Sequence, residues 1–252
     1  MSSELVPGTG VSRVLIVPAA GAGSRLGGAL PKILVPVAGR PMIDHLVGLY
    51  RAFADVIVVV AHPSFSARLH GPFEVVEQRE RSGMLDAVLL ATDAVRQRQP
   101  DEVWITWGDQ VGVLPATVSA LARAMAAPPR PAVALPTVRR ADPYIHFERD
   151  GDGRLSALRQ RREGDRMPAI GESDMGLFAL RRAAYERDLH EYAAGVEPGR
   201  ATGERNFVPF IPWLAQRATV ATYPCVDARE AIGINTPDDL RMMEEWMDTR
   251  TA

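Results

Sequence analysis

The chain has 252 residues and a formal net charge of −2. Charged residues make up 24% of it and hydrophobic residues 46%, which are ordinary values for a globular protein and exclude a disordered one. A sequence pI of about 6.2 provides no field that would gather a phosphate polymer, so we expect no nucleic-acid partner.

No apolar run approaches the roughly 20 residues that cross a bilayer, so we expect no membrane partner. The N-terminal residues lack the basic region of a secretory leader, and the first apolar run, residues 14–17, is too short for its apolar core. Cys225 is the single cysteine, which excludes an intrachain disulfide and fits a reducing compartment. We therefore expect a cytoplasmic protein.

Short apolar runs alternate with helical patterns through the first half of the chain. The spacing predicts strands at residues 14–17, 55–60, 75–76, 103–107 and 132–138, and helices at residues 42–54, 85–98 and 114–125, with Pro41 opening the first helix. Strands that alternate with helices form βαβ units. The pattern therefore predicts an α/β protein with a parallel sheet and helices on both faces.

The second half is less regular. We predict a hairpin at residues 146–158 around an Asp/Gly turn, a strand at 173–180, helices at 183–192 and 207–217, and a strand at 220–223. A last helix is predicted after Asn235, with Thr236 as its N-cap and Pro237 in its first turn. Because the sequence contains no internal repeat, we predict one domain over residues 1–252.

The first predicted strand runs into a loop of small residues, Ala19-Ala20-Gly21-Ala22-Gly23-Ser24-Arg25-Leu26. Its two glycines let the backbone approach a ligand closely, and its N–H groups can hold phosphate oxygens. Leu26 stands where the dinucleotide-binding fingerprint has a third Gly or Ala, and the second strand ends at Ala61-His62 without an acidic residue. A nicotinamide cofactor is therefore disfavoured, and no Walker A motif is present.

Lys32 is the single lysine among the 29 Lys and Arg residues. Chance is one explanation, and a requirement for a compact ammonium that a planar guanidinium cannot replace is the other. Two further features follow predicted strands, namely Gly108-Asp109 after the fourth and Gln78 after the third. Ligands of open α/β sheets bind beyond the carboxyl ends of the strands, so we expect these residues to share one site with the glycine loop.

Pro31-Lys32 and Gly39-Arg40-Pro41 follow the loop, and the three motifs together resemble the signature of the sugar-1-phosphate nucleotidyltransferases. The similarity is greatest to the uridylyltransferase half of the bacterial N-acetylglucosamine-1-phosphate enzymes. Further motifs occur in the family's order over nearly the whole chain: Glu77-Gln78, Ser82-Gly83, Gly108-Asp109, Ser173-Asp174-Met175-Gly176, Gly203-Glu204 and Gly233-Ile234-Asn235. The first block is specific, and the later motifs carry weight as a series.

The resemblance implies a Rossmann-like α/β fold of three layers with a mixed, mostly parallel sheet. It implies a nucleotide-binding half at about residues 12–138 and an acceptor-binding half at about residues 139–252. The hexapeptide repeats that form the acetyltransferase half of the bifunctional relatives do not occur in the 252 residues. We therefore expect no acetyl transfer.

Nucleotidyl transfer brings a phosphorylated acceptor against the α-phosphate of a nucleoside triphosphate and expels pyrophosphate. Catalysis is then largely positioning and neutralisation of negative charge, and no general base is needed because the attacking phosphate is already ionised. Arg25 can hold the β- and γ-phosphates with two parallel hydrogen bonds, and Lys32 would lie near the α-phosphate as a point charge. Asp109 is a predicted Mg²⁺ ligand, and Asn235 resembles the family's second metal contact.

By resemblance, the nucleotide contacts are Ala19, Ala20, Gly21, Gly23, Ser24, Gln78, Gly83 and Gly108. Gln78 and Gly83 match family positions that read a pyrimidine, since an amide can pair with its imide edge. The match at Gln78 and Gly83 favours UTP. Met84 stands where the family has Thr or Ser, and this departure leaves dTTP and CTP open.

The acceptor contacts implied by the resemblance are Tyr144, Gln160, Asp174 and Glu204. Ile145 replaces a family glycine, and Asp174 places a carboxylate where the family has an amide. We therefore expect an acceptor other than N-acetylglucosamine 1-phosphate, such as another sugar phosphate or a cyclitol phosphate.

Other polar and aromatic residues receive structural interpretations. The arginines between Arg139 and Arg166 alternate with acidic residues, which is typical of a solvated surface. The five histidines lack metal-ligand spacing, Trp104 and Trp107 are predicted to be packing residues, and Cys225 is predicted to be a small buried hydrophobe rather than a nucleophile.

Three functions are weighed. The first is a Mg²⁺-dependent nucleotidyltransferase acting on a nucleoside triphosphate and a phosphorylated small molecule. The second is a cytidylyltransferase for a polyol, cyclitol or phosphonate acceptor. The third is a non-catalytic nucleotide-binding regulator, against which the joint presence of Arg25, Lys32 and Asp109 argues. The sequence leaves open whether the protein forms a homo-oligomer.

Overall fold

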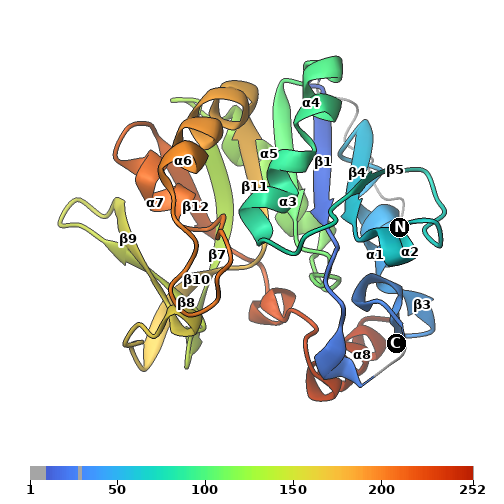
Figure 1. Cartoon of the computed structure of the whole chain (residues 1–252). Helices are drawn as coiled ribbons and strands as arrows, with labels where there is room; N and C mark the ends of the chain where they lie inside the picture. The colour runs from blue at the N-terminus through green and yellow to red at the C-terminus, as the bar shows by residue number, and fades with distance from the viewer. Residues whose placement is uncertain (1–9, 28–29, 252) are drawn as a thin grey trace.

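A central sheet forms the middle layer of the computed structural model, which describes residues 10–27 and 30–251 (Figure 1). Four strands run parallel: β1 (Arg13–Pro18), β4 (Val56–Ala61), β5 (Glu74–Glu77) and β6 (Glu102–Thr106). Beyond β6 the sheet becomes mixed, with β7 (Val133–Ala141), β10 (Ile170–Asp174), β11 (Leu177–Arg181) and β12 (Val220–Pro224). The order is β10-β7-β11-β6-β1-β4-β5, and β12 pairs with β7.

Helices cover both faces of this sheet because its central strands are apolar on both sides. Leu15 and Val17 face α1 (Met42–Tyr50), α5 (Pro115–Ala126) and α8 (Pro237–Thr251). Val14 and Ile16 face α3 (Met84–Leu90), α4 (Thr92–Arg98), α6 (His190–Gly195) and α7 (Phe210–Ala215). The side chains of these four β1 residues are at most 1% exposed. The predicted three-layer α/β fold with a mixed, mostly parallel sheet is confirmed.

Smaller elements complete the described chain. The hairpin predicted in the second half is confirmed as β8 (Ile145–Arg149) and β9 (Leu155–Gln160). The remaining elements are η1 (Ser24–Leu26), η2 (Lys32–Leu34), β2 (Pro36–Val37), β3 (Arg40–Pro41), α2 (Pro63–Ser66), η3 (Arg161–Glu163), the π-helical segment η4 (Ala184–Leu189) and η5 (Ala228–Ala231).

Several predicted boundaries are wrong where backbone geometry interrupts an apolar pattern. The helix predicted at 85–98 is broken at Ala91, and the Thr92 hydroxyl donates to the carbonyl of Leu89 at 2.5 Å. The strand predicted at 173–180 is two strands, because Gly176 turns the chain with a φ of +70°. The first helix ends at Tyr50, and Pro41 precedes it as N-cap with an extended ψ of 146°.

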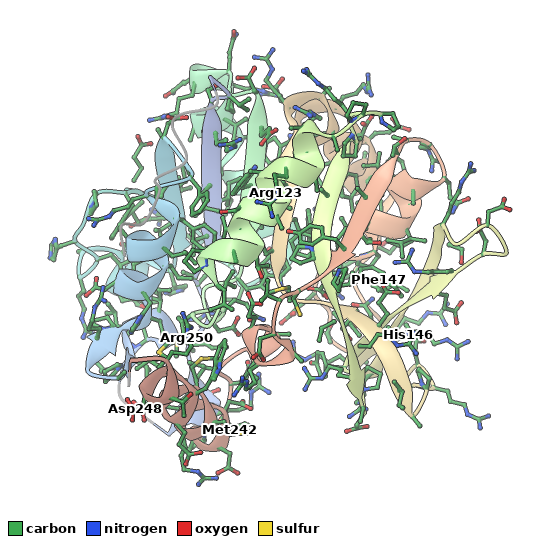
Figure 2. The ribbon with its side chains drawn as sticks, turned by 180° about the vertical axis from the view of Figure 1, so that it is seen from behind. Arg123, His146, Phe147, Met242, Asp248 and Arg250 are labelled. Carbon is green, nitrogen blue, oxygen red and sulfur yellow. The ribbon has the colours of Figure 1, made fainter. Side chains whose placement is uncertain are left out.

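The last helix begins as predicted. Thr236 donates to Asp239 Oδ2 through its backbone N at 2.8 Å and its hydroxyl at 2.9 Å, and Asp239 N donates back to the hydroxyl at 3.2 Å. This reciprocal cap fixes where the chain enters α8. Seen from behind in Figure 2, α8 with Met242 lies at the lower left of the molecule and the hairpin with His146 at the lower right.

No helix in residues 10–27 and 30–251 combines the length and the apolar character that crossing a membrane requires.

Glu230 fastens the segment that leads into α8. Its side chain is fully buried, and it accepts hydrogen bonds from Leu114 N at 2.8 Å, the Thr117 hydroxyl at 2.9 Å and Asp227 N at 2.8 Å. Leu114 and Thr117 belong to the start of α5, where the helix dipole favours a carboxylate. One acidic side chain therefore ties η5, and the residues that follow it, to α5.

We predict that Glu230→Gln destabilises the fold by about 1–3 kcal/mol, because an amide NH₂ would face a backbone N–H that now donates to a carboxylate oxygen. Chemical denaturation monitored by circular dichroism measures this loss. The matched control is Glu245→Gln, whose side chain is 70% exposed in α8 and which should change stability by less than about 0.5 kcal/mol. Equal stabilities of the two variants would contradict the structural role of Glu230.

Candidate active site

An open cavity of about 670 Å³ lies beyond the carboxyl ends of β1 and β6. Open α/β sheets bind their ligands at this position. Residues from both halves of the chain line the cavity. Twelve of the residues predicted from the sequence are in its wall: Ala20, Gly21, Arg25, Lys32, Gln78, Gly83, Asp109, Tyr144, Gln160, Asp174, Glu204 and Asn235.

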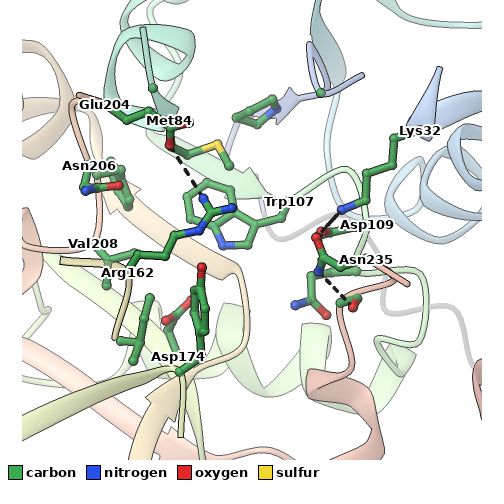
Figure 3. A pocket seen from close by; sticks show the side chains of 18 of the residues that line it. Lys32, Met84, Trp107, Asp109, Arg162, Asp174, Glu204, Asn206, Val208 and Asn235 are labelled. Carbon is green, nitrogen blue, oxygen red and sulfur yellow. Dashed lines mark hydrogen bonds and ion pairs between the residues drawn. The ribbon is translucent and has the colours of Figure 1, made fainter. Parts of the chain in front are cut away.

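Four charged or polar side chains converge at one side of the cavity, and Figure 3 labels three of them, Lys32, Asp109 and Asn235. Lys32 Nζ lies 2.5 Å from Asp109 Oδ2 and 2.8 Å from Asn235 Oδ1. Arg25 donates to the same Asn235 oxygen at 3.0 Å. Lys32 comes from η2, Asp109 follows β6 and Asn235 precedes α8, so three separate segments meet here. Two cations therefore face the cavity beside one carboxylate.

The remaining predicted nucleotide contacts, three in the glycine loop and one after β6, lie outside the cavity wall. Gly23 precedes η1 as its N-cap with a φ of +68° and lies against the backbone of Lys32. Ala19 N donates to Val60 O at 2.7 Å, and Gly108 N donates to Pro18 O at 3.3 Å. Ser24 starts η1 and is exposed. The wall of the cavity includes none of these four residues, and their nucleotide contacts stay predictions.

Gln78 begins and Gly83 ends the loop between β5 and α3, and the two residues are in contact. Gln78 is 4% exposed, and its side-chain amide donates to Gly83 O at 3.3 Å. Gly83 has a φ of +125°, and a Cβ there would lie 2.4 Å from the carbonyl oxygen of Arg205. The glycine is thus required by close backbone packing, in addition to any contact with a ligand.

The second half of the chain supplies the other side of the cavity. The Arg162 guanidinium lies 5.8 Å from the centre of the Tyr144 ring and 3.8 Å from Glu204 (Figure 3). Gly176 N donates to Asp174 Oδ2 at 2.9 Å. Burial raises the pKa of the Asp174 carboxyl to about 6, opposed by that hydrogen bond and supported by the charge of Asp109.

Some cavity residues were given structural interpretations from the sequence. Trp107 packs on Phe178 and Phe207 with ring centroids 5.2 and 5.8 Å away, as predicted, yet it also lines the cavity. Arg140 and Arg162, predicted to lie on a solvated surface, are both in the wall. Arg162 comes two residues after Gln160, which ends β9 and was predicted to contact the acceptor. This closeness in the sequence was the signal that could have placed Arg162 in the cavity wall.

Two other kinds of site were considered, a reactive thiol at Cys225 and a cluster of metal-ligating side chains. Burial raises the pKa of the Cys225 thiol to about 11, so it is not a thiolate at neutral pH. Within the described part of the chain, no group of three or more His, Cys, Asp or Glu side chains is arranged to hold a metal ion.

Residues 15–174 match the MobA-like NTP transferase domain. This match covers more than half of the chain, which therefore belongs to the MobA-like NTP transferase family. The family and the enzyme class predicted from the sequence, a nucleotidyltransferase, are confirmed.

The curated relatives include proteins named bifunctional protein GlmU. The one from Stenotrophomonas maltophilia (strain R551-3) is 30% identical over 248 residues, covering 94% of this chain and 52% of that protein. The one from Heliobacterium modesticaldum is 30% identical over 256 residues, covering 94% and 54%. The one from Sorangium cellulosum is 28% identical over 250 residues, covering 94% and 52%. The chain thus spans about half the length of these curated relatives.

The raised pKa of Asp174 predicts a pH-dependent stability. Because the carboxyl has a pKa of about 6 in the folded chain and 3.8 ordinarily, ionising it disfavours the fold, and stability is lost as pH rises through about 6. We predict that Asp174→Asn melts above the wild type at about pH 7.5, with an advantage that shrinks towards about pH 4.5.

Thermal unfolding of both proteins across this range measures the effect. The control is Asp152→Asn at the exposed hairpin turn, which should follow the wild type at every pH. An Asp174→Asn advantage that stayed constant with pH would show that the carboxyl of Asp174 does not titrate in this way.

Proposed function

We propose that this enzyme joins a nucleoside triphosphate, UTP by preference, to a sugar 1-phosphate or sugar-like phosphate and releases pyrophosphate. The observation that carries the proposal is the convergence of Arg25, Lys32, Asp109 and Asn235 on one cavity beyond the strand ends. Two cations beside a carboxylate oxygen and an amide oxygen that can bind a metal ion suit a triphosphate. The negative charge of the triphosphate must be neutralised for the transfer to occur.

The proposed reaction is a displacement at phosphorus. An oxygen of the acceptor phosphate attacks the α-phosphorus, the bond from the α-phosphorus to the bridging oxygen breaks, and pyrophosphate leaves with that electron pair. In this reaction Lys32 would neutralise the charge that develops at the α-phosphate, and Arg25 would hold the departing phosphates. The attacking oxygen already carries a negative charge, so no side chain has to remove a proton.

The residues at the cavity fit a magnesium ion. Asp109 Oδ2 and Asn235 Oδ1 lie 2.5 and 2.8 Å from Lys32 Nζ, so a carboxylate oxygen and an amide oxygen are brought together beside one cation. Mg²⁺ is commonly held by one or two protein oxygens together with substrate phosphates and water. The ion would supply neutralising charge to the phosphates when bound. Lys32 holds the same two oxygens, so its ammonium competes with any ion for them.

The preference for UTP rests on Gln78. Its buried amide is oriented by Gly83 O at the wall of the cavity, and a buried amide discriminates bases because a mismatched edge leaves it unpaired. Tyr144, Gln160, Asp174 and Glu204 form the side contributed by the second half, where we place the acceptor. The carboxylate of Asp174 favours an acceptor that presents hydrogen-bond donors there.

We predict that Lys32→Met slows nucleotidyl transfer by roughly ten- to a thousand-fold, because an ammonium that stabilises developing charge contributes several kcal/mol of transition-state stabilisation. Continuous detection of pyrophosphate with saturating substrates measures the rate. Arg51→Met, an exposed cation beyond α1, is the control and should retain full turnover. A Lys32→Met enzyme with nearly normal turnover would remove Lys32 from the mechanism.

A substrate panel tests the function itself. Each of UTP, dTTP, CTP and ATP is combined with Mg²⁺ and a set of sugar 1-phosphates, polyol phosphates, cyclitol phosphates and phosphonates, and pyrophosphate release is followed. We expect turnover with UTP and a sugar or sugar-like phosphate. Turnover confined to CTP and a polyol phosphate or phosphonate would replace the proposal with a cytidylyltransferase. Calorimetric triphosphate binding without turnover on any acceptor would indicate a regulator.

A further inference from the structure

Gln110 is a buried side chain whose hydrogen bonding is incomplete. It directly follows Asp109, is 6% exposed and lies in the cavity wall. Its backbone N donates to Trp107 O at 3.1 Å. Across residues 10–27 and 30–251, its Oε1 is the one buried side-chain oxygen or nitrogen that lacks a hydrogen-bond partner.

Two glycines make room for this side chain. A Cβ on Gly176 would lie 2.9 Å from Gln110 Cγ, and a Cβ on Gly233 would lie 3.3 Å from its Nε2. The same Gly233 position would be 3.4 Å from Asp109 Oδ2 and from Asn235 Nδ2. Gln110 therefore spans the distance between the turn after Asp174, on the acceptor side, and the charged cluster.

A buried amide oxygen without a donor destabilises the folded state, and an apolar side chain of the same length would avoid that loss. A ligand in the cavity can supply the missing donor. Ionised phosphate oxygens only accept hydrogen bonds, so the partner of Oε1 cannot be a phosphate. A hydroxyl group can donate, and sugars present several.

We propose that Gln110 is a specificity-determining residue whose Oε1 accepts a hydrogen bond from a sugar hydroxyl of the bound substrates. The inference rests on the proposed function, since that function brings two sugars to the cavity. The hydroxyl belongs either to the ribose of the nucleotide or to the acceptor, and the chemistry that Gln110 recognises is the same in both cases.

Gln110→Met tests the proposal because methionine keeps the length and lacks the amide. We expect the ligand-free variant to melt at or above the temperature of the wild type, while an apparent KM rises about tenfold or more. Gln97→Met, an exposed position in α4, is the matched control and should alter neither quantity. A purely structural role would instead lower the melting temperature and leave each KM unchanged, which would overturn the proposal.

Two arms identify the sugar, with UTP, 2′-deoxy-UTP and α-D-glucose 1-phosphate as probes in the presence of Mg²⁺. If the ribose is read, Gln110→Met raises the UTP KM alone, and a wild-type preference for UTP over 2′-deoxy-UTP that this variant loses assigns the contact to the 2′-hydroxyl. If the acceptor is read, the glucose 1-phosphate KM rises alone. No change in either KM overturns the proposal.

The melting comparison separates this proposal from the function on which it rests. Should the wild type neither bind UTP nor release pyrophosphate, the proposed function fails. A Gln110→Met variant that then melted below the wild type would overturn the inference as well. A variant that melted above the wild type would support the finding that the Gln110 Oε1 lacks a hydrogen-bond partner.

Discussion

One ammonium group joins segments of the chain that are far apart in the sequence. Lys32 contacts Asp109 across 77 residues and Asn235 across 203. The side chains of Lys32 and Asp109 are 18% and 17% exposed, so water and salt screen their interaction less than a surface pair. The charged cluster forms because the fold brings three segments together. These are the segment after the glycine loop, the end of β6 and the start of α8.

The cavity has two chemically different sides. The charged cluster occupies one, and aromatic and polar side chains of the second half occupy the other, where Arg162 lies between Tyr144 and Glu204. Asp174 and Gln110 are both unfavourable for the stability of the interior, because the Asp174 carboxyl has a raised pKa and the Gln110 Oε1 lacks a hydrogen-bond partner. Such departures concentrate at sites that bind ligands, since the ligand supplies the missing partner.

Much of the fold could be predicted because hydrophobic periodicity reports burial directly. Residues 14–17 and 56–60 are continuous apolar runs, and they lie in the parallel strands β1 and β4 in the middle of the sheet. The failures occurred where one residue changes the backbone direction inside an apolar run. Gly176 separates β10 from β11, and the break at Ala91 separates α3 from α4, although the apolar pattern continues across both.

The sequence by itself determined the strand–helix alternation and the residue types that suit phosphate and a divalent ion, because these depend on local pattern and side-chain chemistry. It could not determine which polar groups stay unpaired, or that Trp107, Arg140 and Arg162 line the cavity. Those facts depend on how β11, the β8–β9 hairpin and the turn before α8 pack against one another. Such packing fixes distances between residues that no local pattern connects.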